Sequence, residues 1–191
     1  MLHLGSQSPR RKEILSFFTK NFTIKVPPFD EALIDFEGDP AAYVETLSRE
    51  KALSIGISDE DVLITADTIV ALDDHILEKP TSNEHAIEML LEMSGRQHSV
   101  FSGVTVKVKD RLYTTSQETV VTCHEYNRKN AERYVSHFNV LDKAGGYSIQ
   151  DGGGLIVESI TGCYYNVMGL PLQSLREMLA KGGVNLWDLL D

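Results

Sequence analysis

Apolar residues recur along the chain with two different spacings, and each spacing predicts one kind of secondary structure. Spacings of three and four residues predict helices, whereas alternation and short continuous runs predict strands. The predicted helices cover about residues 9–18, 40–51, 86–93, 128–138 and 172–180. The predicted strands cover about residues 1–5, 22–26, 62–66, 69–72, 100–108 and 112–123.

Polar and turn-forming residues mark the ends of these elements. Ser8-Pro9 and Asp39-Pro40 each place a capping side chain before a proline that suits the first helical position. Thr81 and Glu84 fit a capping box ahead of the third helix. Gly182-Gly183 ends the last helix.

The order of the elements predicts a mixed sheet. Helices alternate with strands, which favours parallel pairing through βαβ units. The strands over 100–108 and 112–123 instead follow each other across a turn at Lys109-Asp110, as a hairpin does. We therefore expect an α/β fold with a mixed rather than purely parallel sheet.

Size and composition are those of a globular domain. The 191 residues suffice for one domain, with one or two lobes, and for a core without covalent support. The hydrophobic fraction of 42% and the charged fraction of 24% are typical of soluble proteins. Cys123 and Cys163 form no close pair, and no apolar run resembles a signal or membrane segment. A cytoplasmic protein with two reduced thiols is expected.

The charge distribution bears on the ligand. A formal net charge of −10 disfavours nucleic acid as a partner. Local cations can still attract a small anion, and Arg10, Arg11 and Lys12 follow Ser8-Pro9 in the first turn of a helix. Cations there oppose the helix dipole, but a phosphate bound at the helix N-terminus would explain them. A capped helix with solvated arginines is the alternative.

Asp67-Thr68 interrupts two apolar runs. A carboxylate between buried strands is costly unless it has a partner. The pattern favours a general base or a metal ligand at a strand end, where α/β sheets place functional residues. The alternative is a sharp turn in which Asp67 faces water.

Other charged residues extend this set. Lys51 lies late on the second helix, and Lys79 and Lys143 lie beside structure breakers, where single lysines are most often solvated. No P-loop motif is present. The pair Asp30-Glu31 together with Asp67 could hold a hard cation such as Mg²⁺, whereas the histidines show no zinc-ligand spacing.

The chain resembles the Maf family, also called septum-formation inhibitors, over nearly its whole length. The motifs that carry the resemblance occur in family order. They are LGSQSPRRKEIL at 4–15, Asp30-Glu31, YVETLSREKA at 43–52, TADTIV at 65–70, LEKP at 77–80, MSGRQHSVFSGV at 93–104, DKAGGYSIQ at 142–150 and YYNVMGLPL at 164–172.

The resemblance implies a fold and a reaction. The implied fold is one domain over residues 1–191, with a mixed twisted sheet flanked by helices and two lobes around a cleft, as in inosine-triphosphate pyrophosphatases. The implied reaction converts a nucleoside triphosphate and water to the monophosphate and pyrophosphate, with a divalent cation (Mg²⁺ or Mn²⁺) and a homodimeric enzyme. Asp67 matches the family's proton acceptor, and Glu31 and Asp67 are the expected metal ligands. The family's substrate contacts carry over onto Ser8, Arg10, Arg11, Glu31, Lys51, Lys79 and Gln150.

Three positions resemble the branch of the family that acts on dTTP and UTP. They are Arg10, Thr68 and Gln150, where the branch that acts on 7-methyl-GTP has an aromatic residue, Gln and an acid. Arg10 would repel a cationic methylated purine, and the amide of Gln150 suits the imide edge of a pyrimidine. A nucleotide-binding regulator of septum formation without turnover is the alternative function, but it would not need Asp67.

Overall fold

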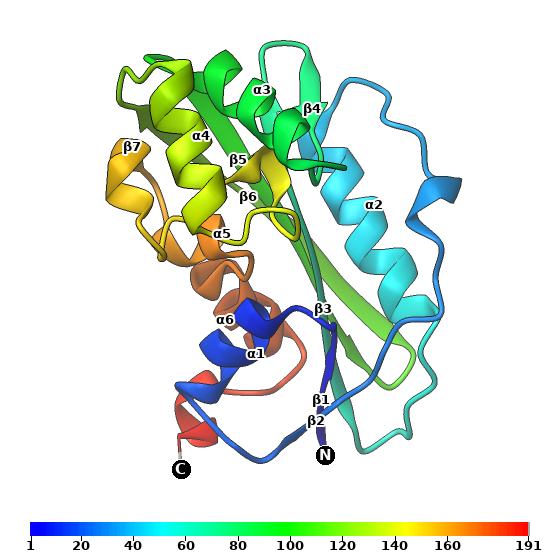
Figure 1. The fold of residues 1–191 in the computed structure, drawn as a ribbon. Helices are drawn as coiled ribbons and strands as arrows, with labels where there is room; N and C mark the ends of the chain where they lie inside the picture. The colour runs from blue at the N-terminus through cyan, green and yellow to red at the C-terminus, as the bar shows by residue number, and fades with distance from the viewer. Residues whose placement is uncertain (191) are drawn as a thin grey trace. The chain divides into compact units, whose positions relative to one another are not determined.

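The computed structural model describes residues 1–190, which contain six α-helices and seven strands (Figure 1). The helices are α1 (Pro9–Ser16), α2 (Pro40–Leu53), α3 (Asn83–Met93), α4 (Arg128–His137), α5 (Tyr164–Met168) and α6 (Leu172–Lys181). The strands are β1 (Leu2–Gly5), β2 (Phe22–Ile24), β3 (Val62–Leu72), β4 (His75–Leu77), β5 (Gln97–Val108), β6 (Arg111–Cys123) and β7 (Val157–Thr161). Short 3₁₀ helices are η1 (Glu31–Leu33), η2 (Ala144–Gly146), η3 (Gly153–Leu155) and η4 (Leu186–Leu189).

The strands form one mixed sheet in the order β2-β1-β3-β5-β6-β7, and β4 also pairs with β3. β1 is parallel to β2 and β3, whereas β4 is antiparallel to β3 and β7 is antiparallel to β6. The mixed α/β fold predicted from the order of the elements is therefore confirmed. The register pairs Gly5 with Thr65, so the loop that follows β1 begins beside the part of β3 that leads to Asp67.

Two compact units share this chain, and each is described by itself. The first unit comprises residues 1–68, 102–117 and 169–191, of which 191 lies outside the described residues. The second comprises residues 69–101 and 118–168. Strands β3, β5 and β6 each contribute residues to both units. A single domain over 1–191 with a cleft between two lobes stays a prediction.

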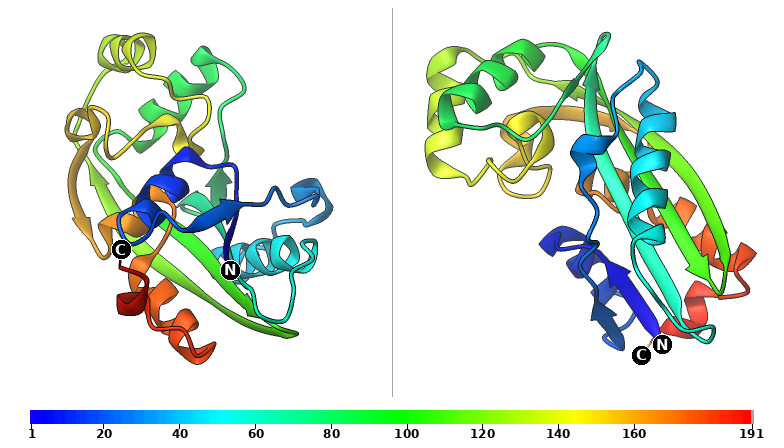
Figure 2. Two further views of the ribbon diagram at one scale, coloured as in Figure 1. Left: turned by 90° about the horizontal axis from the view of Figure 1, so that it is seen from below. Right: turned by 90° about the vertical axis from the view of Figure 1, so that its right-hand side faces the viewer.

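In the first unit, α1 and α2 lie on opposite sides of β1 (Figure 2). The strand order explains this arrangement, because the chain moves outward from β1 to β2 and then returns past β1 to β3. Two right-handed crossovers in opposite directions place their helices on opposite faces of the sheet. Side chains on the two faces of β3 can therefore meet different helices.

Buried hydroxyl groups hold α2 against the sheet. The Oγ1 of Thr65 on β3 donates to the carbonyl of Ser48 at 2.6 Å, and the hydroxyls of Ser48 and Thr105 are 2.9 Å apart. All three residues are fully buried. Close to this contact, α2 lies so near β5 that only glycine fits at position 103, because a Cβ there would lie 2.1 Å from the carbonyl oxygen of Val44.

The second unit has its own apolar core, and His98 is buried against two of its members, Tyr147 and Cys123. Leucines, methionines and valines from β3–β6, α3 and α4 make up most of this core. His98 is 3% exposed, and its Nε2 lies 2.7 Å from the hydroxyl of Tyr147. Burial lowers the pKa of His98 to about 4, so the imidazole is neutral near pH 7. Burial likewise raises the pKa of the adjacent Cys123 thiol to about 11.

Several sequence-based predictions are confirmed at the level of single residues. Ser8 and Asp39 are the N-caps of α1 and α2, each followed by a proline. Both cysteines are free thiols. None of the helices among residues 1–190 combines the length and apolarity needed to cross a bilayer.

Two predictions are wrong. The N-cap of α3 is Ser82 rather than Thr81, because the Ser82 hydroxyl is the one that accepts from the amide of His85, and Glu84 pairs with Arg128 instead of closing a capping box. Asp67-Thr68 does not end a strand or form a turn. Both residues lie inside β3, which continues from Val62 to Leu72.

The close approach of α2 to β5 predicts that Gly103→Ala is destabilising. The added methyl group would meet backbone atoms of Val44, which cannot rotate away, so the helix and the strand must separate. We expect the free energy of unfolding in urea to fall by about 1–3 kcal/mol. Gly56→Ala is the matched control, because a Cβ there meets no atom within 4 Å. Equal stability of the two variants would contradict the close packing.

Candidate active site

The loop between β1 and α1 is organised by two serines. The amide of Ser8 donates to the Oγ of Ser6 at 3.1 Å, and the Oγ of Ser8 accepts from the amide of Arg11 at 3.5 Å. Pro9 occupies the first helical turn, which contains no acidic residue. The loop therefore presents Arg10 and Arg11 at a helix N-terminus, where nothing in the first turn offsets their charge.

Arg11 is held by three partners of the first unit. Its Nε donates to the carbonyl of Gly169 at 2.8 Å, Nη1 to the Oγ of Ser6 at 3.3 Å, and Nη2 to the Oγ1 of Thr68 at 3.1 Å. Burial is the main cause that lowers the pKa of Arg11, and the charges of Asp67 and Glu31 oppose that shift. The guanidinium stays protonated and has five N–H groups, of which these bonds use three.

Asp67 and Thr68 are consecutive on β3, so their side chains leave the strand on opposite faces. Asp67 shares its face with Thr65 and meets α2. Thr68 points to the other face, where its hydroxyl lies 2.8 Å from the Oγ of Ser102 and 3.3 Å from the carbonyl of Gly169. One short stretch of β3 thus contacts both α1 and α2.

Lys51 lies between two carboxylates. Its Nζ is 2.5 Å from the Oδ1 of Asp67 and 2.7 Å from the Oε1 of Glu31. Lys51 and Asp67 are each 7% exposed, whereas the side chain of Glu31 is 52% exposed. Asp30, the other acid of the predicted pair, instead caps η1 by accepting from the amide of Ala32. Of the two neighbouring acids, Glu31 therefore pairs with Lys51, and Asp30 caps a 3₁₀ helix.

The first unit brings together most of the residues singled out in the sequence. Asp67 contacts Lys51, which contacts Glu31, and Thr68 contacts Arg11, whose amide bonds to Ser8. Arg10 is half-buried on the same helix as Arg11, and its charge is close enough to contribute to lowering the pKa of Arg11.

Lys79 and Gln150 belong to the second unit, so their participation in this site stays a prediction. Sequence reasoning missed Ser6, Ser102 and the carbonyl of Gly169. Each lies within one of the motifs quoted above, but hydroxyls and backbone carbonyls carry no distinctive sequence signal.

Comparison with known proteins identifies the family. The family model described as Maf-like protein matches residues 1–182. The chain belongs to the Maf-like protein family. Among its relatives, the dTTP/UTP pyrophosphatase of Chlamydia caviae is 45% identical over 99% of this chain and 97% of its own length. The dTTP/UTP pyrophosphatase of Clostridium perfringens is 43% identical over 92% of this chain and 94% of its own length.

The name of a third relative specifies no particular nucleotide, and one solved structure is similar only at low identity. The nucleoside triphosphate pyrophosphatase of Chlamydia muridarum is 39% identical to this Maf-like protein over 99% of the chain and 97% of the relative. The Staphylococcus aureus Ham1 protein aligns with a TM-score of 0.46 and 13% identity, covering 81% of this chain and 90% of that one.

The site of this Maf-like protein has few groups suited to a metal. Within residues 1–190, no three or more His, Cys, Asp or Glu side chains are grouped in a way that could hold an ion. Mg²⁺, however, is commonly held by one or two carboxylates together with substrate phosphates and water. Glu31 and Asp67, whose oxygens converge on one ammonium, fit that smaller requirement.

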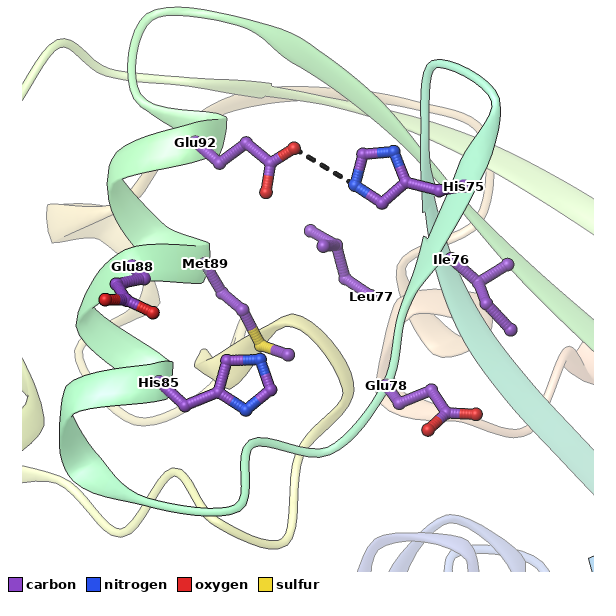
Figure 3. Close-up of a pocket in the computed structure, with 8 residues that line it drawn as sticks. All are labelled: His75, Ile76, Leu77, Glu78, His85, Glu88, Met89 and Glu92. Carbon is purple, nitrogen blue, oxygen red and sulfur yellow. Dashed lines mark ion pairs between the residues drawn. The ribbon is translucent and has the colours of Figure 1, made fainter. Parts of the chain in front are cut away.

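A pocket of about 390 Å³ lies in the second unit, between β4 and α3 (Figure 3). His75 and Glu92 face each other there, 3.0 Å apart, above the apolar side chains of Leu77 and Met89. Leu77 and Glu78 of the LEKP motif line this pocket, but none of the predicted site residues does. We assign it no role in the chemistry.

The Thr68 hydroxyl predicts a stability difference between two substitutions. Thr68→Val keeps the shape of the side chain but removes the hydroxyl that bonds to Arg11 and to the fully buried Ser102. We expect the free energy of unfolding in urea to fall by about 1–3 kcal/mol. Thr68→Ser, which retains the hydroxyl, should lose much less. Equal losses would show that the hydroxyl network contributes nothing to stability.

Proposed function

We propose that this Maf-like protein is a nucleoside triphosphate pyrophosphatase that hydrolyses dTTP and UTP to the monophosphate and pyrophosphate. The observation that carries the proposal is the contact of Asp67 with Lys51 in the unit that also orients Arg11. The names of the relatives from Chlamydia caviae and Clostridium perfringens, each more than two-fifths identical, support the same substrates.

The charge of the site suits a polyphosphate. Arg10, Arg11 and Lys51 carry three positive charges, against two negative charges on Glu31 and Asp67. Summed over these five side chains the formal charge is +1, in a protein whose formal net charge is −10. Preorganised cations of this kind stabilise the charge that develops on phosphoryl oxygens in the transition state. Ser8 at the N-cap of α1, and Lys79 of the second unit, complete the proposed phosphate contacts.

Asp67 is the proposed general base. Its carboxylate takes a proton from the water that attacks the α-phosphorus, and pyrophosphate leaves as the bond between the α- and β-phosphates breaks. The proposal is direct hydrolysis, because a water activated by Asp67 requires no covalent intermediate. Arg11 and Lys51 orient the phosphates and offset their charge.

A divalent cation, Mg²⁺ or Mn²⁺, is part of the proposal, with Glu31 and Asp67 as its protein ligands. When bound, it would polarise phosphoryl oxygens and offset their negative charge. The carboxylate oxygens of the two residues are the kind of ligand that hard cations prefer.

Substrate choice is assigned to Arg10, Thr68 and Gln150. Arg10 disfavours a cationic methylated purine, and Gln150 offers both a donor and an acceptor to the imide edge of thymine or uracil. The contacts of the Thr68 hydroxyl with Arg11 and Ser102 suggest that Thr68 acts by orienting Arg11. The proposal also includes a homodimer in the cytoplasm that binds neither nucleic acid nor membranes.

A panel of nucleotides tests the proposed reaction. We expect pyrophosphate release from dTTP and UTP with a kcat/KM at least about tenfold above that for CTP or 7-methyl-GTP, a difference of about 1.4 kcal/mol in transition-state binding. A preference for 7-methyl-GTP would overturn the substrate assignment. Binding of nucleotides without release of pyrophosphate would favour the alternative of a regulator of septum formation.

Asp67→Asn tests the base. The variant should fold and bind dTTP, but its kcat should fall by about 10²–10⁴-fold, because an amide cannot accept the proton. Asp59→Asn removes the same charge from an exposed position of the same unit and should retain wild-type kcat. If Asp67→Asn were within a few-fold of wild type, Asp67 would not be the base.

A further inference from the structure

Lys51 is a lysine removed from water between two acids. Its side chain is 9% exposed, and its Nζ contacts both Asp67 and Glu31. Moving an ammonium into a protein is costly unless carboxylates compensate it, and the same holds for the buried carboxylate of Asp67. In the nucleotide-free protein, the ammonium of Lys51 therefore stabilises both carboxylates, and each carboxylate stabilises the ammonium.

The same two carboxylates are the ligands assigned above to the divalent cation. A carboxylate oxygen that accepts a short hydrogen bond from an ammonium is less available to a metal ion, so the two cations compete for one pair of acids. The backbone of Lys51 has little freedom, because α2 is held by Ser48 and Thr65 one turn away. Its four-carbon side chain has the flexibility to move the ammonium while the helix stays in place.

We propose that Lys51 is a resident counter-ion that a divalent cation displaces from Glu31 and Asp67, and that the displaced ammonium pairs with the substrate's phosphates. The inference rests on the metal assignment of the proposed function. Lys51 is then a positioning residue in two states, bound to acids without substrate and to phosphate with it. The nucleotide-free protein binds the metal weakly as a consequence.

This exchange couples the metal to the nucleotide. The phosphates give Lys51 a new partner, which lowers the cost of releasing the carboxylates to the metal. Such coupling is reciprocal, so metal and nucleotide each strengthen the binding of the other. Removing the ammonium should strengthen metal binding without nucleotide and weaken the coupling.

The test measures Mn²⁺ binding to the nucleotide-free protein, with the electron paramagnetic resonance signal of free Mn²⁺ as the readout. We expect Lys51→Met to bind Mn²⁺ at least about tenfold more tightly than wild type, which corresponds to about 1.4 kcal/mol. Lys25→Met is the matched control, because it also removes one positive charge from the first unit. The Nζ of Lys25 contacts the carbonyl of Gly56 rather than a carboxylate. The control should bind Mn²⁺ as wild type does, and adding Glu31→Gln to Lys51→Met should abolish the gain.

A measurement on the wild-type protein covers the case in which Lys51→Met does not fold. Acylation of Lys51 by an amine-specific reagent, followed by mass spectrometry, should accelerate several-fold when Mn²⁺ is added. Unchanged acylation at saturating Mn²⁺, or a Lys51→Met variant that binds Mn²⁺ no more tightly than wild type, would overturn the inference. Either result would overturn the displacement of Lys51 even if wild type hydrolyses dTTP. Conversely, tight Mn²⁺ binding by Lys51→Met would support the displacement even if wild type does not hydrolyse dTTP. The two proposals can therefore fail separately.

Discussion

The carboxylate of Asp67 leaves β3 in the middle of a strand that is buried along most of its length, and it needs a cation within reach. An unpaired charge at such a position costs several kcal/mol. Lys51 supplies the cation from α2, and the hydroxyls of Ser48 and Thr65 hold that helix at the required place. The helix lies close enough only because residue 103 has no side chain. Packing and electrostatics in this unit therefore depend on one another.

Side chains alternate along β3, so the residue next to Asp67 lies on the other face of the sheet. Thr68 follows Asp67 directly and so points toward α1, where it accepts a hydrogen bond from Arg11. Two helices that lie on opposite sides of β1 are thus connected through neighbouring residues of one strand. This arrangement places an acid and two cations close together without crowding them onto one face.

Local signals in the sequence were sufficient for much of the fold. Capping side chains followed by proline located the starts of α1 and α2, because both signals act within a single turn. The short strands β4 and β7 were missed, because neither shows the alternation of apolar and polar residues that marked the equally short β1 and β2. The polar pair Asp67-Thr68 was read as the end of a strand, but partners on both faces allow β3 to continue through it.

By itself, the sequence determined the kinds of element, their order and the identity of Arg11, Lys51 and Asp67 as candidate site residues. Only the tertiary structure decided which of them meet. The carbonyl of Gly169 lies 158 residues along the chain from Arg11, the residue it holds, and Asp30 and Glu31 are adjacent in sequence but serve different partners. Hydrophobic patterning specifies which face of an element is buried, because burial depends on the element's own period. It carries no information about which distant segment supplies the hydroxyl, carbonyl or ammonium that a buried charge requires, since any residue with a suitable group can satisfy that requirement once the chain has folded.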